Sequence, residues 1–490
     1  MKYEKILEEA KNFTPNFRPE EIEELLAKVS KLKKSEKRKV METIKKSASL
    51  PYKEQEAIMK EVAPQQNADQ LAIVESMIGN FGVENILSTK AHIWIWNKSE
   101  GRWKNTSDIE VRQGIQNYLR QNELEVTSSL VNAITSLLKP HVYKESHEWD
   151  ANPDIINFHN GELHYENGSW NLKDHCRENY RTTVIPYNWD SKAQCPRFLQ
   201  FLNEIFSNDA DKKEKQTCLL EMIGYSLTNT CKFEKYIILV GEGANGKTVL
   251  LELVARIAGL ENTCAVQPLE FNNKFQRAHL QGKLVNIVSE LKQGGKIPDD
   301  AVKAITTGEL ITAEHKNMPP FSFKPYCTLW FATNHMPNLS DFSHGSSRRP
   351  VILQFNERFI PGKNADLDLK AKLQKEIPGI IALCLEAYGR ALARGHLTEP
   401  PSSLIAKQNW ITEQDQVKMF LFEKCAQDPT ASVKSNKLYE LYKNWCRNQG
   451  LKFLTHNDFT KRIQQNGAKT DRGTGGVRLI TRLRISDASD

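Results

Sequence analysis

The sequence lacks the long apolar runs that would place it in a membrane. None of its apolar stretches approaches the roughly 18 residues that a spanning helix needs. The first residues, MKYEKILEEAKNF, mix charged and apolar types and contain no apolar signal core. We therefore expect no membrane partner, and we expect the protein to stay in the compartment where it is made.

Cysteine is sparse and unpaired along the chain. Nine cysteines are scattered singly between Cys176 and Cys446, and no CxxC occurs, so neither a disulfide framework nor a zinc ribbon is indicated. His159, His164 and His175 lie near Cys176, but their spacing matches no common zinc pattern. We interpret them as isolated side chains in a protein of a reducing, cytoplasmic compartment.

Length and charge indicate a multi-domain protein with a basic end. The 490 residues exceed what one hydrophobic core usually organises, so two to four domains are expected. The net charge is +7. Between Lys434 and Arg484 lie twelve basic and three acidic residues, and the net charge of this segment exceeds the net charge of the whole chain. A second basic cluster, Lys28 to Lys39, lies in a region of charged helices over 1–66, where it is either a solvated face or a nucleic-acid contact.

Composition shifts divide the first half of the chain. PQQNADQ (64–70) is typical of a linker, and a mixed α+β domain over 70–195 follows it. Its hairpins are predicted by the turn Ser99 to Gly101 and by the Asn-Gly pairs at 160–161 and 167–168. The apolar spacing from Pro196 onward then predicts a helical collar over 196–235, which leads into the strand YIILV.

The segment GEGANGKT has the strand-loop-helix setting of a phosphate-binding loop, because YIILV precedes it and an amphipathic segment ending near Gly259 follows. Backbone N–H groups of such a loop turn inward on the phosphates. Lys247 would reach the β/γ oxygens, and the Thr248 hydroxyl would ligate Mg²⁺. The predicted nucleotide-binding residues are Gly241, Glu242, Gly243, Ala244, Asn245, Gly246, Lys247, Thr248 and Val249.

A second strand, KLVNIVSE, supplies the acid that such a site needs to hold the metal or orient water. Glu290 falls at its carboxyl end, where α/β sites gather. Many nucleotide hydrolases carry two adjacent acids here, whereas this chain has Ser289 before Glu290. The rival pair, Asp299 and Asp300, follows a proline and is typical of a helix start.

Two further strands carry polar residues at their ends. Asn334 ends TLWFATNH, where it would hydrogen-bond the γ-phosphate or the attacking water, or else begin an Asx turn before Met336. Arg348 and Arg349 precede a strand over 351–355. They are either surface charge or candidates for an arginine finger inserted into a neighbouring subunit's site, which implies a ring.

A short hairpin is predicted between the acid strand and the Asn334 strand. Ile311–Ala313 and Phe321–Phe323 form its arms, and the tip carries His315 and Lys316. A basic tip projecting from an ATPase core can grip a phosphate backbone, although an exposed loop with an incidental Lys-His pair fits the same residues.

The basic end of the chain is predicted to be a winged-helix domain over 410–486. Three amphipathic helices are followed by a hairpin that turns at 473–476, and its return strand places Val477, Leu479, Leu483 and Ile485 on one face. This domain either contacts DNA or stays on the core as a structural cap. The candidates for phosphate contact are Lys461, Arg462, Lys469, Arg472 and Arg478.

Residues from about 150 to 360 together resemble the superfamily 3 helicases of the phage, plasmid and poxvirus primase-helicase type. The resemblance is carried by NFHNGELHYENGSWNL, GEGANGKT, LQGKLVNIVSE, VKAITTGELITAEH, FSFKPYCTLWFATNHMP and SSRRPVILQF. It implies an α/β fold with an AAA+ P-loop ATPase core over 236–395. It also implies a homo-hexameric ring that uses ATP and Mg²⁺ to move along single-stranded DNA, typically 3′ to 5′, and to unwind forked DNA.

The resemblance also assigns roles to matching residues. Lys247 and Thr248 correspond to the Walker A positions, Glu290 to the Walker B acid and Asn334 to the sensor. Arg348 corresponds to the arginine finger, and His315 with Lys316 to the hairpin that lines the channel. Only about 70 residues precede the family's N-terminal region, so a separate primase or polymerase is implied.

The interpretation is therefore a replicative helicase of a phage or mobile element, in a bacterial cytoplasm or at a viral replication site. Two alternatives stay open. One is a DNA-binding ATPase that acts as an initiator, loader or packaging motor without unwinding a fork. The other is an interaction protein whose assembly is controlled by nucleotide.

Overall fold

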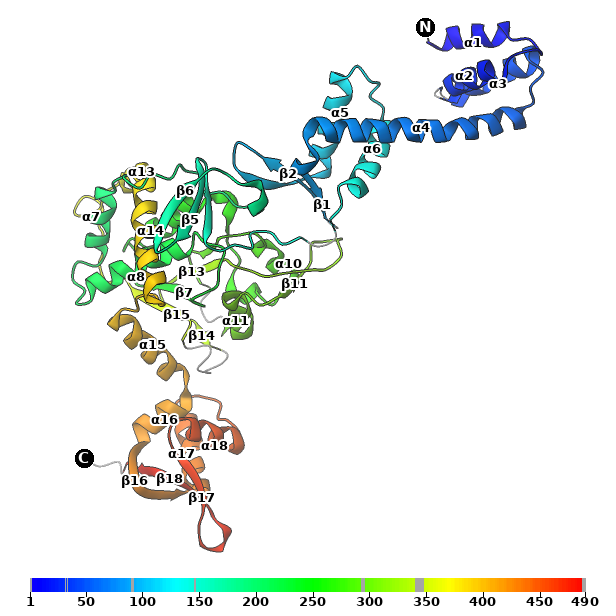
Figure 1. The fold of residues 1–490 in the computed structure, drawn as a ribbon. Helices are drawn as coiled ribbons and strands as arrows, with labels where there is room; N and C mark the ends of the chain where they lie inside the picture. Colours follow the sequence, from blue (N-terminus) through cyan, green and yellow to red (C-terminus); the bar gives the residue numbers. More distant parts are fainter. Residues whose placement is uncertain are drawn as a thin grey trace. The chain divides into compact units, whose positions relative to one another are not determined.

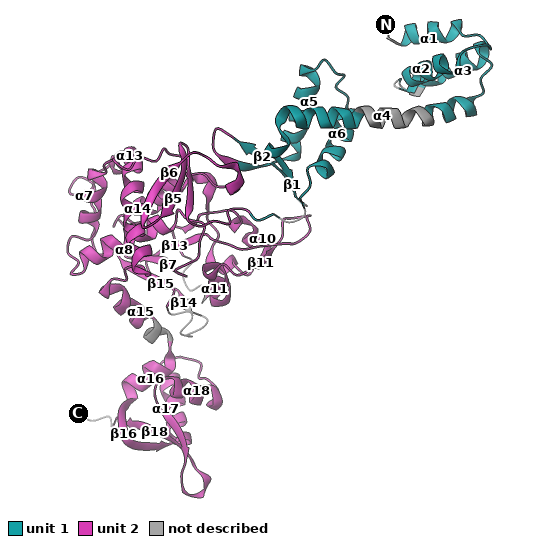
Figure 2. Cartoon of the chain, viewed as in Figure 1, with its two compact units in different colours: residues 1–97, 103–148 teal, residues 98–102, 149–490 magenta. Residues whose placement is uncertain are grey.

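The fold was analysed in a computed structural model, which describes residues 2–30, 32, 34–89, 92–144, 147–291, 296–339 and 348–486. The chain divides into two compact units (Figures 1 and 2). Unit 1 comprises residues 1–97 and 103–148, and unit 2 comprises residues 98–102 and 149–490. Among the described residues, no helix has the length and apolar character needed to cross a bilayer.

Unit 1 begins with a helical bundle and continues into a small sheet covered by helices. The region predicted as charged helices is helical, and in α2 four apolar residues at helical spacing are buried. The elements of unit 1 are α1 Lys2–Asn12, α2 Pro19–Ser30, α3 Lys34–Ser47, α4 Tyr52–Phe81, β1 Ile86–Ser88, β2 Ile93–Asn97, β3 Arg102–Thr106, α5 Asp108–Gln121 and α6 Ser128–His141. The strands β1, β2 and β3 form one sheet in that order, with the predicted turn at Gly101 between β2 and β3.

The predicted linker at 64–70 is wrong, because α4 runs through it without a break. A proline removes one backbone hydrogen bond from a helix, at a cost of about 3 kcal/mol. The flanking stretches are rich in Glu, Ala, Gln, Ile and Met, which favour helix. Their summed propensity outweighs the cost of the single proline.

The first three strands of unit 2 form an antiparallel sheet in the order β4-β5-β6, with bounds Ile155–Phe158, Gly161–Glu166 and Ser169–Lys173. The predicted Asn-Gly turns lie at both connections, and Asn167 and Gly168 have φ of 53° and 80°. The apolar side chains of Ile156, Phe158 and Leu163 belong to the same hydrophobic core as the strand before GEGANGKT. Residues 149–195 therefore pack with the part of the chain that carries GEGANGKT.

A five-stranded parallel sheet forms the centre of unit 2, in the order β15-β7-β13-β9-β8. Alternate residues of β7 enter two different cores: Ile237 and Leu239 face one, and Tyr236 and Ile238 face the other. Because successive side chains point to opposite faces and both faces are buried, each of these strands is a continuous apolar run in the sequence.

The elements of this part are α7 Pro196–Ile205, α8 Lys212–Tyr225, β7 Tyr236–Val240, α9 Lys247–Ala258, β8 Thr263–Cys264, α10 Lys274–Arg277, β9 Val285–Val288, β10 Lys296–Ile297, α11 Asp299–Thr307, β11 Ile311–Ala313, β12 Phe321–Phe323, β13 Thr328–Thr333, β14 Asn338–Leu339, β15 Pro350–Gln354, α13 Leu369–Lys375, α14 Ile377–Arg394 and α15 Pro401–Gln414.

The predicted collar helices α7 and α8 are present, but they are completed by a helix from much later in the chain. The Cα atoms of α14 and α8 approach closely, and a Cβ on Gly224 of α8 would lie 2.5 Å from the Cys384 carbonyl oxygen of α14. Sequence order gave no signal for this pairing, because it joins segments about 160 residues apart.

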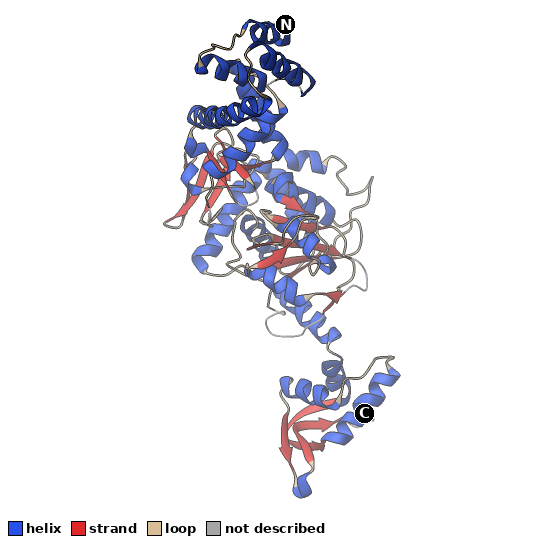
Figure 3. Ribbon diagram, turned by 90° about the vertical axis from the view of Figure 1, so that its right-hand side faces the viewer, coloured by secondary structure: helices blue, strands red, loops and turns tan. Residues whose placement is uncertain are grey.

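The C-terminal part combines helices and strands (Figure 3). It has its own hydrophobic core, which includes Phe420, Tyr442 and Phe459. Its elements are α16 Gln416–Lys424, β16 Cys425–Lys434, α17 Ser435–Asn448, α18 His456–Gln465, β17 Lys469–Arg472 and β18 Arg478–Ile485. The three helices and the hairpin were predicted, whereas β16, which pairs with β18, was not.

The predicted apolar face of the return strand is correct at Leu483 and Ile485, which pack in the C-terminal core, and wrong at Val477 and Leu479. Ile480 and Leu483 are its buried residues, while Val477 is exposed. Simple alternation fails because Arg482 has a φ of 69° and the pairing with β16 shifts register here. Such a bulge moves one residue out of the period-two pattern, so residues three apart face the same core.

Candidate functional site

The loop 241–246 joins the carboxyl end of β7 to the first turn of α9, as the sequence predicted. Two of its backbone conformations are demanding. Gly246, the N-cap residue, has a φ of 94°, and Ala244 has a φ of 61° without being glycine. At Gly241 a Cβ would lie 2.4 Å from the Phe355 carbonyl oxygen. The loop is therefore a tightly packed cradle whose shape depends on small residues.

Lys247 points back into this cradle. Its ammonium donates to the Gly241 carbonyl at 2.5 Å and to the Asn245 side-chain oxygen at 3.0 Å. The side chain is buried, and this burial lowers the pKa of the Lys247 ammonium. Thr248 is exposed in the first turn of α9, and Val249 packs partly against the core. One buried cation is thus held at the N-terminus of a helix, where backbone N–H groups and the helix dipole favour an anion.

The loop is held between the carboxyl ends of the two strands that flank β7. On one side the Gly241 amide donates to Thr333, the last residue of β13, at 3.2 Å. On the other side Asn245 donates to the Phe355 carbonyl at 3.3 Å, and the Phe359 amide donates to Ala244 at 2.7 Å. Glu242 and Gly243 are exposed on the remaining side.

Glu290 and Asn334 lie at the same edge of the sheet as the loop. Asn334 directly follows β13 and is exposed. Glu290 lies two residues beyond β9 and is exposed, and the next amide, Leu291, donates to Ala332 of β13 at 3.0 Å. Because parallel strands bring their carboxyl ends together, Glu290 and Asn334 lie at the same end of the sheet as Lys247.

The rival acids Asp299 and Asp300 occupy the first turn of α11. The N-cap residue is Pro298, and no side-chain capping hydrogen bond forms there. The two carboxylates therefore lie at the predicted helix start, where they complement the helix dipole without accepting the expected capping bond.

Arg348 and Arg349 lie at the opposite edge of the sheet. Pro350 pairs with Tyr236, the first residue of β7, whereas the loop follows Val240 at the other end. These ends are about 13 Å apart at the usual rise per residue. Arg348 has a half-exposed side chain, and both arginines pair with Glu234, just before β7. The chain therefore does not direct either arginine into its own loop.

The predicted hairpin is present, with Ile311 paired to Phe323 and Ala313 to Phe321. His315 and Lys316 are exposed at the tip, and the His315 ring stacks on Phe321 with centroids 5.0 Å apart. The base is fixed to α10, since the Glu314 amide donates to the Lys274 carbonyl at 3.1 Å and their side chains form an ion pair.

The cations of the C-terminal part concentrate on one hairpin and one helix. Arg472 and Arg478 are exposed and directly opposite each other across β17 and β18. Lys469 lies on β17, and Lys461 is exposed on α18 next to the half-buried Arg462. Facing cations repel each other, which makes this pair a surface that favours anions.

Comparison with known families covers most of the chain in three consecutive blocks. Residues 74–207 match the family described as D5 N terminal like, and residues 412–471 match the family described as Poxvirus D5 protein-like. The chain is therefore similar to D5-like proteins in two separate blocks. Between these blocks, residues 239–349 of the D5-like chain match a family of unknown function.

A curated relative of the D5-like chain is the "Putative helicase L207/L206" of Acanthamoeba polyphaga mimivirus. The two are 24% identical over 228 residues, which is 45% of this chain and 24% of the relative, so the chain spans about a quarter of that protein. The apo C-terminal region of NrS-1 has a TM-score of 0.47 at 12% identity, covering 85% of this chain and 99% of that one. Its A form gives a TM-score of 0.45 at 13% identity, covering 81% and 95%.

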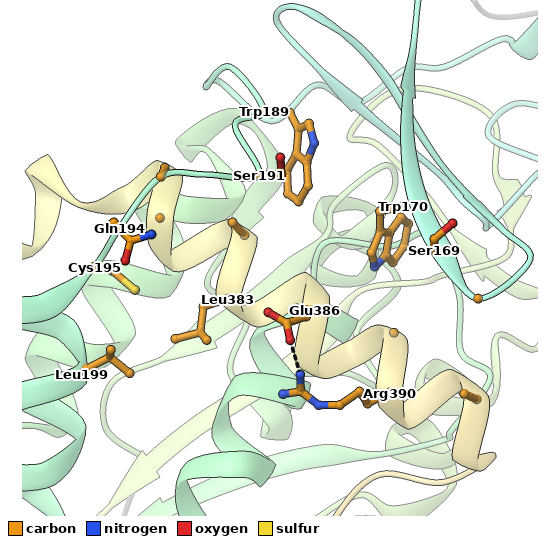
Figure 4. Close-up of a pocket in the computed structure, with 16 residues that line it drawn as sticks. Ser169, Trp170, Trp189, Ser191, Gln194, Cys195, Leu199, Leu383, Glu386 and Arg390 are labelled. Atoms are coloured by element: carbon orange, nitrogen blue, oxygen red, sulfur yellow. Dashed lines mark hydrogen bonds and ion pairs between the residues drawn. The ribbon is translucent and has the colours of Figure 1, made fainter.

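The D5-like chain also has a pocket of about 630 Å³ that contains none of the predicted site residues. Trp170 and Trp189 lie on one side of it and the exposed face of α14 on the other (Figure 4). The Glu386–Arg390 ion pair, at 2.5 Å, lies along that helix. Neither this pocket nor Glu234 was found from the sequence, because a lone acid before an apolar strand is not a distinctive pattern.

Proposed function

We propose that this D5-like chain is a replicative DNA helicase that hydrolyses ATP with Mg²⁺ and works as a ring, each nucleotide lying between two subunits. The observation that carries the proposal is the separation of the loop and Arg348 to opposite edges of one sheet. A phosphoryl-transfer site needs a cation opposite the P-loop lysine. A second copy of the chain would supply it.

The residues at the loop edge fit a magnesium nucleotide. Gly241 lies so close to Phe355 that a side chain there would have no room, as expected where backbone must approach phosphates. Thr248 and Glu290 offer hydroxyl and carboxylate oxygens, the donor types that Mg²⁺ prefers. When bound, the metal would neutralise charge on the phosphates, while Lys247 holds their β/γ oxygens and Asn334 orients the attacking water.

Two surfaces of the chain suit DNA. The tip of the hairpin between β11 and β12 offers His315 and Lys316 for phosphate contact, and the C-terminal part has the helix and hairpin elements of a winged-helix domain. We assign Lys461, Arg462, Lys469, Arg472 and Arg478 to its DNA contacts. A translocation direction of 3′ to 5′ and a separate primase or polymerase complete the proposal.

The deciding experiment is an unwinding assay on forked DNA with ATP, using substrates of both polarities. The proposal expects strand separation on the 3′-tailed substrate and particles with ring symmetry by electron microscopy. Hydrolysis stimulated by DNA without strand separation on either substrate would favour an initiator or loader instead. Hydrolysis that is indifferent to DNA would favour a nucleotide-controlled assembly protein.

We predict that replacing His315 and Lys316 together by alanine abolishes unwinding and leaves basal ATP hydrolysis within about twofold. The tip lies outside the nucleotide site, so the variant loses only its grip on the phosphate backbone. Both activities are measured on the same preparation. An alanine at the exposed Lys213 of α8 is the matched control and should change neither. Normal unwinding by the double variant would contradict this role.

We also predict that replacing Arg472 and Arg478 by alanine weakens DNA binding and flattens its salt dependence. Each lost phosphate contact lowers the slope of log K against log salt by about 0.7 on single strands and 0.9 on duplex. Fluorescence anisotropy at several salt concentrations measures that slope, which should fall by nearly two on duplex. An unchanged slope would mean that the hairpin caps the protein instead of contacting DNA.

A further inference from the structure

Glu234 is a carboxylate that pairs with both Arg348 and Arg349 at the amino end of the sheet. We infer that Glu234 is a positioning residue, which orients Arg348 toward the nucleotide bound by the neighbouring subunit. The inference rests on the proposed function and adds to it a residue outside every motif of the sequence.

The two arginines differ in how firmly they are held. Arg349 has a 4% exposed side chain and places a guanidinium nitrogen 3.2 Å from Glu234 Oε2. Arg348 is 54% exposed and forms its ion pair with the same oxygen. The buried guanidinium therefore fixes the carboxylate, and the carboxylate in turn fixes the exposed guanidinium.

The backbone on both sides of this contact is fixed as well. Glu234 has a φ of 51°, and its amide donates to Cys231 at 2.9 Å. Phe233 packs edge-on against Tyr225, with ring centroids 5.7 Å apart. Lys235 donates to the Arg348 carbonyl at 2.6 Å. Side chain and main chain of Arg348 are thus held by two consecutive residues.

Lys235 is itself anchored. Its ammonium lies 3.2 Å from a Glu399 oxygen, and Glu399 also pairs with Lys407 of α15. Burial lowers the pKa of Lys235, although Glu399 opposes this shift. A continuous series of contacts therefore links Lys407 of α15 through Glu399 and Lys235 to Arg348. The Arg348 guanidinium is the exposed end of this series.

Pairing with the buried Arg349 accounts for a carboxylate at this position, but stability does not account for its second pair, with Arg348. A left-handed backbone is unfavourable for any residue with a Cβ, and an exposed ion pair such as Glu234–Arg348 contributes little. Strained non-glycine residues persist where surrounding structure dictates them, and they cluster at functional sites. Here the left-handed backbone of Glu234 places its carboxylate between the buried Arg349 and the exposed Arg348.

Because the exposed Glu234–Arg348 pair is weak, Arg348 can exchange the carboxylate for a phosphate. The planar fork of Arg348 binds a carboxylate and a phosphate with the same geometry. A guanidinium already held near its working orientation loses less freedom when it meets a phosphate in the transition state. Loss of Glu234 should therefore lower kcat and leave KM for ATP unchanged.

The test uses Glu234→Gly and Glu234→Gln in the full-length protein. Glycine removes the carboxylate and relieves the left-handed strain, but it also takes this carboxylate away from the buried Arg349, so thermal denaturation first checks that the variant is folded. We expect kcat to drop about tenfold for glycine, less for glutamine, with KM unchanged. Glu386→Gln, which breaks an ion pair whose arginine is as exposed as Arg348, should leave kcat unchanged. An unchanged kcat in the glycine variant overturns the inference.

Mixed assemblies separate this inference from the proposed function. A Glu234→Gly subunit has an intact loop, and a Lys247→Ala subunit has a correctly held Arg348. We expect that adding Lys247→Ala protein raises the hydrolysis rate per Glu234→Gly subunit severalfold. If the added Lys247→Ala protein leaves the hydrolysis rate per Glu234→Gly subunit unchanged, while it does restore activity to Arg348→Ala protein under the same conditions, the inference is overturned. If Arg348→Ala is not complemented either, the proposed shared site fails instead.

Discussion

Replacing Lys247 by alanine should reduce ATP hydrolysis roughly 10²- to 10³-fold, as loss of one preorganised charge contact to a developing oxyanion does. The ammonium is buried, and three oxygens of its own loop surround it. No other cation of the described loop 241–248 can take over its contact with the β/γ oxygens. Steady-state hydrolysis, with and without DNA, measures the effect.

The control for this variant is Lys370→Ala. Lys370 is exposed and pairs with Glu252 of α9, the same helix that Lys247 begins, so it tests for general disturbance of that helix. Thermal denaturation checks that the Lys247→Ala protein is folded. DNA-stimulated hydrolysis at a normal rate in this variant would show that GEGANGKT is not the hydrolytic site.

Replacing Arg348 by alanine should lower kcat about 10³-fold in a homogeneous assembly, the lower end of the effect of an arginine finger. Its own loop lies at the other edge of the sheet, so the loss should fall on a neighbour's site. Mixing Arg348→Ala with Lys247→Ala protein should then restore part of the activity, because some interfaces combine an intact loop with an intact arginine.

Arg390→Ala is the matched control, since Arg390 has the same exposed fraction as Arg348 and also holds a carboxylate. It should hydrolyse ATP at the normal rate. If Arg348→Ala impaired only the protomer that carries it, with no recovery in mixtures, the arginine would not act between subunits.

The local structure of the candidate site was predictable because it depends on short-range patterns. A strand, a glycine-rich loop and an amphipathic helix follow one another directly around Lys247, and the hairpin arms pair residues only about ten positions apart. Prediction failed where the helix propensity of flanking residues or a bulge in a strand overrode the local pattern. Proline did not end α4, and the bulge at Arg482 turned Ile480 inward.

The roles of Glu290, Asn334, Arg348 and the DNA-contacting cations remain predictions, although the placement of these residues is now defined. Lys247, Glu290 and Asn334 lie at one edge of the sheet. Arg348 lies at the other. The order of these residues along the chain does not say which strands are neighbours in the sheet.

The sequence by itself determined the loop GEGANGKT between its strand and helix, the strands that precede Glu290 and Asn334, the basic hairpin tip and the resemblance to superfamily 3 helicases. Each of these depends on residues close together in the chain. Only the tertiary structure decided that α14 completes the collar, that residues 149–195 pack with the central sheet, and that Glu234 holds Arg348. The physical reason is that burial and ion pairing act between residues close in space, and the parallel order of the strands brings residues 234 and 348 together.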